Sequence, residues 1–206
     1  MVADIDLLAE EITGCRICRD GPDGQCLPHD PRPVVKLSAS ARICIAGQAP
    51  GMRVHKTGIP FNDPSGDRLR DWMGVSREIF YDQSRIAIVP MGFCFPGYDA
   101  KGGDLPPRKE CVGRWHDRVF ATMPQLELIL VIGQYAQRYH LGSRRGKTLT
   151  QTVQMARSLW QEQANPRILP LPHPSWRNSA WLKNNPWFES DVLPLLRREV
   201  QKYCCP

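Results

Sequence analysis

The sequence lacks any run of apolar residues near the roughly 20 that a membrane-spanning helix requires, so no membrane partner is expected. Its opening, MVADIDLLAEEI, lacks the basic start of a secretory signal, which predicts a cytosolic location. Internal repeats and low-complexity tracts are also absent, which excludes a repeat architecture. What is present, 206 residues of which 42% are hydrophobic and 23% charged, predicts a single domain over residues 1–206 and a monomer.

Charge and cysteine content indicate the partners. The formal net charge is +6 and the pI is near 9.0, which favours a polyanion such as DNA because each neutralised phosphate releases counterions. Eight cysteines in a cytosolic chain favour metal ligation or catalysis over disulfides.

Apolar runs alternate with helical patterns along the chain. This alternation predicts a three-layer α/β/α fold with a central, mainly parallel, four-stranded sheet, on which a cysteine-bearing segment, residues 1–40, packs. The expected strands are 41–47, 86–90, 126–133 and 167–172. The expected helices are 3–12 with Asp4 as its cap, 66–73, 108–121, 134–139, 150–161 and 188–203.

Two segments rich in Gly, Pro and polar residues follow expected strands. They are GQAPGMRVHKTGIPFNDPSG (47–66) and LPHPSWRN (171–178). The carboxyl ends of parallel strands are where open α/β folds bind ligands, so both segments are candidates for a site. Each could also be a turn in which proline fixes φ and Asn or Asp caps the next helix.

Together the two segments resemble the first and second motifs of the uracil-DNA glycosylase superfamily, a Gly-(Gln/Glu)-x-Pro-(Gly/Tyr) turn and a late His-Pro-Ser. The resemblance runs from Cys15 to Asn178 and implies a hydrolase that removes uracil from single- or double-stranded DNA. The GIPF stretch (58–61) is similar to bacterial and archaeal branches that carry a [4Fe–4S] cluster, which implies a bacterial or archaeal cytosol. The D-x-S-G string (63–66) and Asn178 resemble the fifth, broad-specificity branch.

The first motif departs from its relatives because Gln48 and Ala49 stand where other branches have a catalytic carboxylate. This moves the expected chemistry to Asp63, whose carboxylate would stabilise the sugar cation and position water. Capping of the next helix is the alternative for Asp63. His55 is a weaker candidate for the same role.

The resemblance assigns His173 a hydrogen bond to O2 of a flipped uracil, with a structural histidine as the alternative. It assigns Phe61 to base stacking and Gln48 and Ala49 to holding the base or the water. Asn178 is expected at the base as well. At PMGFC (90–94) the uracil-preferring branch has an Asn that this sequence lacks, so relaxed selectivity toward hypoxanthine or xanthine is expected. The backbone at Met91 or Gly92 is the alternative group for contacting the edge of the base.

Four cysteines give a second match. Cys15 and Cys18 form CxxC, and Cys94 and Cys111 are separated by sixteen residues, which resembles the ligand spacing of a [4Fe–4S] cluster. Four-cysteine zinc and buried free thiols are the alternatives. Cys26, Cys44, Cys204 and Cys205 receive no role.

Residues after His173 are expected to meet DNA: Ser175, Trp176, Arg177 and Lys183, with Trp176 or Trp181 as the wedge that enters the base stack. A DNA-binding protein that kept the fold without catalysis is the rival function. A member that cross-links to the abasic product through a histidine in an inserted loop is a third hypothesis, for which no matching insertion is present.

Overall fold

Four strands form one sheet in the computed structural model, which describes residues 5–162 and 164–204. They are β1 (Ile43–Ala46), β2 (Ile86–Ile88), β3 (Leu128–Ile132) and β4 (Arg167–Leu171), in the order β2-β1-β3-β4. Every neighbouring pair is parallel, so all four carboxyl ends lie at one edge. The predicted four-stranded parallel sheet is confirmed, and each strand is shorter than the apolar run that predicted it.

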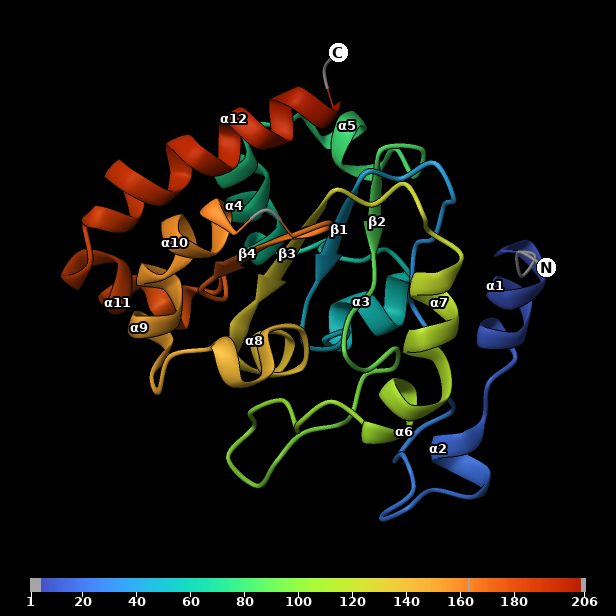
Figure 1. Ribbon diagram of the computed structural model, residues 1–206. Coiled ribbons are helices and arrows are strands. Elements are labelled where there is room, and N and C mark those ends of the chain that lie inside the picture. Colours follow the sequence, from blue (N-terminus) through green and yellow to red (C-terminus); the bar gives the residue numbers. More distant parts are fainter. Residues whose placement is uncertain (1–4, 163, 205–206) are drawn as a thin grey trace.

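Side chains of each strand alternate between two apolar cores, which gives three layers (Figure 1). Ile43 and Ile45 of β1 enter one core together with α4 (Pro64–Met73) and α12 (Leu193–Cys204). Cys44 and Ala46 enter the other core, with α7 (Asp117–Ala121) and α8 (Gly133–Leu141). Because both faces are covered, the strands read as continuous apolar runs.

The helices are more divided than their sequence patterns indicate. The expected helix 108–121 is α6 (Lys109–Cys111), a π-helical turn η1 (Val112–His116) and α7. The expected helix 150–161 is two helices, α9 (Leu149–Gln154), which begins with a Thr148–Gln151 capping box, and α10 (Ala156–Gln161). The remaining helical elements are α3 (Met52–Thr57), α5 (Arg77–Tyr81), η2 (Gly142–Arg144), η3 (Trp176–Asn178), α11 (Ser179–Asn184) and η4 (Phe188–Val192), which leads into α12.

The N-terminal segment packs on the second core. Leu8 and Ile12 of α1 (Ile5–Thr13) are buried there, and Glu11 pairs with Arg118 of α7 at 2.8 Å. The proposed cap Asp4 lies outside the described residues. α2 (Ile17–Asp20) follows below α1 (Figure 1). No helix in the described ranges is both long and apolar enough to cross a bilayer.

Candidate functional site at the carboxyl edge of the sheet

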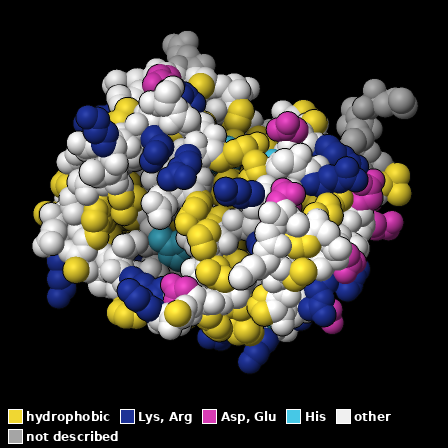
Figure 2. Space-filling model, turned by 90° about the horizontal axis from the view of Figure 1, so that it is seen from below, with side chains coloured by type: hydrophobic (Ala, Val, Ile, Leu, Met, Phe, Trp, Pro, Cys, Tyr) yellow, Lys and Arg dark blue, Asp and Glu magenta, His cyan; other side chains and the backbone are white. Residues whose placement is uncertain are grey.

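The segments after β1 and β4 meet at the carboxyl edge, as expected. Figure 2 views the molecule from this side, where a histidine lies deep in a hollow bordered by apolar side chains, with Lys and Arg around it. The residues that form this site come from the turn after β1, the start of α4 and the turn that carries His173.

His173 is held in one tautomer by its own turn. The Ser175 backbone N–H donates to His173 Nδ1 at 3.2 Å, so in the neutral ring the proton is on Nε2. Burial lowers the pKa of His173 below its usual value; Arg177 also lowers it, whereas Asp63 opposes the shift. The arrangement therefore provides a neutral imidazole that can donate one hydrogen bond through Nε2.

The backbone of the His173 turn is clamped from two sides. Arg68 of α4 donates through Nη1 to the carbonyl oxygens of Pro174 and Ser175, at 3.3 and 3.0 Å. Asn178 donates through Nδ2 to the His173 carbonyl at 2.8 Å. Asn178, predicted to contact the base, thus has a structural task that the sequence did not reveal, because its amide group holds the turn.

Asp63 caps α4, which was the alternative weighed for it. Its Oδ1 accepts the Gly66 N–H at 2.9 Å. Its charge nevertheless acts on His173 and on Asp104, so the carboxylate lies near both. Only one carboxylate oxygen serves the cap, and Oδ2 has no hydrogen-bond partner within the described part of the chain.

Phe61 adopts a backbone conformation that bulky residues rarely take, with φ of 53°. A Cβ added to Gly66 would lie 1.8 Å from the Phe61 carbonyl oxygen, so position 66 must be glycine while Phe61 keeps this conformation. The Phe61 ring lies edge-on to Phe80 at 6.0 Å, and a Cβ on Gly47 would lie 3.4 Å from it. The ring is therefore beside the turn after β1 while also packing on the core.

The segment after β2 is tied to the turn after β1. Met91 N–H donates to the Gly47 carbonyl at 2.9 Å, and Gly92 N–H donates to the Gln48 carbonyl at 3.0 Å. The N–H groups of Met91 and Gly92 are therefore engaged, and their carbonyl oxygens are the backbone groups of these two residues that remain for a ligand. A Cβ on Gly92 would meet Arg108 N at 3.0 Å, so glycine here makes room for the chain itself. Gln48 and Ala49 are half-buried.

The two candidate wedges differ in exposure. Trp176 is 76% exposed, whereas Trp181 packs against Trp187 and donates from Nε1 to Thr150 Oγ1 at 2.9 Å. Trp181 is thus a packing residue, whereas the Trp176 side chain lies at the surface. Arg177 lies over the Trp176 ring, with Cζ 5.8 Å from its centroid, and Lys183 is exposed on α11.

A family model described as the uracil DNA glycosylase superfamily matches residues 35–197, most of the chain. The chain belongs to this superfamily. The match includes both motif turns, β1 to β4 and α4, so the three-layer fold and the location of the site at the carboxyl edge agree with membership. It begins after Cys15 and Cys18, so membership in the superfamily does not by itself establish an iron–sulfur branch.

The four predicted cluster cysteines come together in this superfamily member. Cys15, Cys18, Cys94 and Cys111 line one small pocket, completed by Pro31, Pro33, Phe93 and Trp115. A hydrogen bond with Cys111 lowers the pKa of Cys18 to about 7, and burial raises that of Cys94 to about 12. The Phe93 N–H donates to Cys111 Sγ at 3.4 Å. Among residues 5–162 and 164–204, however, no group of three or more His, Cys, Asp or Glu side chains is arranged to hold a metal ion.

The other cysteines lie apart from this pocket. Cys26 is exposed, Cys44 is buried in β1 and Cys204 is buried at the end of α12, while Cys205 lies outside the described residues. The ring of His55, the weaker catalytic candidate, lies tilted against the rings of His29 and Phe95, with centroids 4.3 and 6.1 Å away.

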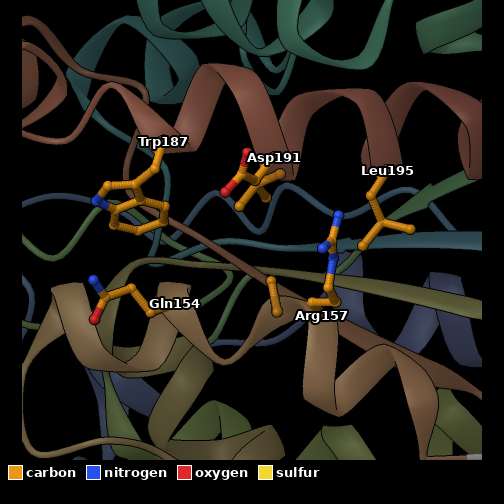
Figure 3. Close-up of a pocket in the computed structure, with 7 residues that line it drawn as sticks. Gln154, Arg157, Trp187, Asp191 and Leu195 are labelled. Atoms are coloured by element: carbon orange, nitrogen blue, oxygen red, sulfur yellow. The ribbon is translucent and has the colours of Figure 1, made fainter.

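A separate cavity of about 230 Å³ lies between α9–α10 and the segment from Trp187 to Leu195 (Figure 3). Arg157 and Asp191 approach it from opposite sides. No residue predicted for the functional site lines this cavity. The hollow that contains the motif turns is therefore the candidate site.

One site residue was missed in the sequence. Asp104, in the loop between β2 and α6, has its Oδ2 3.7 Å from a Cβ built on Gly51 of the first motif. The Gly102-Gly103 pair could have indicated a loop that folds back, although not which surface it reaches.

Proposed function

We propose that this chain is a monofunctional DNA glycosylase that flips a deaminated base out of DNA and hydrolyses its N-glycosidic bond, leaving an abasic site. Uracil is the first candidate substrate. The observation that carries the proposal is the combination, at one opening, of an imidazole fixed as an Nε2 donor and a carboxylate with one unpaired oxygen. No lysine stands at a motif position that would form a Schiff base, so no lyase step is included.

Asp63 acts at the sugar. As the bond from C1′ to the base lengthens, positive charge develops on the sugar, and a nearby carboxylate stabilises it. Asp63 also orients the water that adds to C1′ and accepts its proton. Its cap bond to Gly66 supports this role because it fixes the direction of the carboxylate.

His173 acts at the departing base. Uracil leaves with the electron pair of the broken bond, and the negative charge spreads onto O2. A donor at Nε2 stabilises that charge without transferring its proton, and the Ser175 N–H ensures that the donor is at Nε2. Removing one such donor in other enzymes lowers kcat by about 10²–10³.

Few side-chain amides are available to hydrogen-bond to the flipped base. Phe61 stacks on it, Gln48 and Ala49 hold one edge, and carbonyl oxygens near Gly92 are the remaining polar groups. Uracil and hypoxanthine each carry an N–H where cytosine and adenine have a bare acceptor, so a carbonyl acceptor suits deaminated bases as a class. Weak side-chain readout supports relaxed selectivity.

DNA binds across the rim of the hollow. Trp176 enters the stack in place of the flipped base, and Arg177, Lys183 and the Ser175 hydroxyl contact phosphates. The net charge of +6 supports this binding mode, and it predicts that affinity falls steeply with salt.

A [4Fe–4S] cluster is the proposed cofactor, with Cys15, Cys18, Cys94 and Cys111 as ligands. The convergence of four thiols on one pocket and the N–H donated to Cys111 Sγ fit such a group. Zinc held by the same four cysteines is the alternative. The cluster would join α2 to α6, and hydrolysis requires no electron transfer from it.

The rival, a non-catalytic DNA-binding protein, is favoured by one observation: neither Gln48 nor Ala49 provides the carboxylate of other branches. Base release separates the two. Oligonucleotides carrying uracil, hypoxanthine or xanthine are incubated with wild type, Asp63→Asn and His173→Ala, and abasic sites are then cleaved with alkali. Asparagine can still cap α4, so the Asp63 variant should fold.

We expect release by the wild type and losses of about 10² or more in both variants. Asp71→Asn, which removes an exposed carboxylate from the same helix α4, is the control and should keep full activity. DNA binding without release of any base would establish the rival.

A further inference from the structure

A second carboxylate reaches the opening from a loop that neither motif contains. Tyr98 and Asp104 form an antiparallel bridge, and the Leu105 N–H donates to the Gly97 carbonyl at 2.9 Å. The Asp99 carboxylate accepts N–H groups of Lys101 and Gly103 at 2.8 and 2.9 Å, which fixes the tip of this hairpin. The loop extends below the sheet in Figure 1, at the end where the motif turns lie. Asp104 is thus placed by an ordered hairpin.

Asp104 faces both motifs. Its Oδ2 lies near Gly51 of the first motif turn, where an added Cβ would be 3.7 Å away. Arg177, from the His173 turn, and Asp63, at the start of α4, both act on its charge. Asp63 and Arg177 also act on His173, so four ionisable groups from three loops share one opening.

The surroundings of Asp104, an exposed residue, raise its pKa above the usual carboxyl value. Burial is the largest cause that raises the pKa of Asp104, and the negative charges of Asp63 and Asp99 raise it further, while Arg177 opposes them. The turn that contains Gly51, residues 47–51, has no charged side chain that could oppose this shift in the pKa of Asp104. Two carboxyl groups in different environments are the usual basis for dividing acid and base roles in glycosidic hydrolysis.

We propose that Asp104 is a catalytic general acid that protonates the departing base when that base is a purine. This inference rests on the proposed glycosylase function. The bond between C1′ and the base breaks with its electron pair going to the base, and the Asp104 proton is transferred to a ring nitrogen of that base. Water adds to C1′ and gives its proton to Asp63, which releases that proton to solvent, and solvent returns a proton to Asp104.

Uracil depends less on this acid than a purine does. The uracil anion is delocalised over its carbonyl oxygens and is stabilised by the His173 Nε2–H, whereas hypoxanthine leaves more readily after protonation. Loss of Asp104 should therefore change the ratio of the two activities, which a general loosening of the fold would not do.

The test is single-turnover release of hypoxanthine and of uracil from matched duplexes by wild type, Asp104→Asn and Asp104→Glu. We expect Asp104→Asn to slow hypoxanthine release by about 10²-fold and uracil release by less than about fivefold, with partial recovery in Asp104→Glu. Wild-type hypoxanthine release should fall as pH rises through the pKa of Asp104, and this basic limb should disappear in Asp104→Asn. Glu189→Gln, an exposed carboxylate on η4, is the charge control.

Equal slowing of uracil and hypoxanthine release in Asp104→Asn would overturn the proposal, because it would indicate a structural role. Tighter DNA binding with unchanged release rates would also overturn it, because Asp104 would then only restrain Arg177. Wild type that releases uracil but not hypoxanthine would also overturn it and leave the glycosylase function intact. Wild type that releases neither base would overturn the function and this inference together.

Discussion

The His173 turn and the cysteine pocket lie at the same edge of the sheet but are held differently. Around His173, the chain's own groups are paired: Ser175, Asn178 and Arg68 each make a hydrogen bond that fixes the turn. Around Cys18 and Cys111, the thiols interact mainly with one another, with Arg108 and with the Phe93 N–H. The His173 turn is therefore held by hydrogen bonds within the chain, whereas the cysteine pocket contains the four thiols that we propose as cluster ligands.

Removing a cysteine should give the largest effect, because the cysteine pocket is the proposed site of the cluster. Cys18→Ser should abolish the visible absorption and bound iron of a [4Fe–4S] cluster and destabilise the fold by about 3 kcal/mol, as loss of a structural cross-link does. Iron analysis, absorption and thermal unfolding measure this.

The matched control is Cys26→Ser, which changes an exposed cysteine of the same N-terminal segment. It should retain iron and stability. Full cluster content in Cys18→Ser, or equal loss in both variants, would contradict the ligand assignment.

His116 contacts the wall of the cysteine pocket, because its ring stacks on Phe93. Its Nε2 hydrogen-bonds to the Pro90 carbonyl at 3.2 Å. Burial lowers the pKa of His116 to about 4. The unfolded chain, with an ordinary histidine pKa, therefore binds more protons between pH 6.5 and 4, and stability should fall as pH falls through this window, by about 3 kcal/mol in total.

His116→Gln keeps a donor for Pro90 but does not titrate. Denaturant unfolding as a function of pH should show a shallower acid decline for this variant than for wild type. Parallel curves would mean that His116 is not responsible for the acid sensitivity.

Arg68→Met should have the smallest effect on stability and a selective effect on catalysis. Losing the bonds to Pro174 and Ser175 should cost about 1 kcal/mol and lower Tm by about 2–4 °C. The loosened His173 turn should lower kcat for base release by about tenfold, since a donor must be positioned closely.

Arg197→Met is the control, because Arg197 also donates to a carbonyl, that of Asp71, away from the opening. It should lower stability by a similar amount and leave kcat unchanged. Equal kcat values in Arg68→Met and Arg197→Met would contradict a positioning role for Arg68.

Sequence patterns predicted the sheet and both motif turns because buried parallel strands are continuous apolar runs and Gly/Pro-rich turns follow them. They did not predict the positive φ of Phe61, which depends on its carbonyl fitting against Gly66. Nor did they separate Trp176 from Trp181, because exposure is decided by the packing of Trp187. Asp104 was missed because a loop's destination depends on long-range contacts that no local pattern encodes.

The bond from Ser175 to His173 has an evolutionary consequence. The donor is a backbone amide, so almost any codon at position 175 preserves the histidine tautomer, and only proline would remove it. The His173 imidazole therefore keeps its tautomer when the side chain at position 175 is substituted. The side chain at position 175 can therefore change while the Nε2 donor of His173 stays in place.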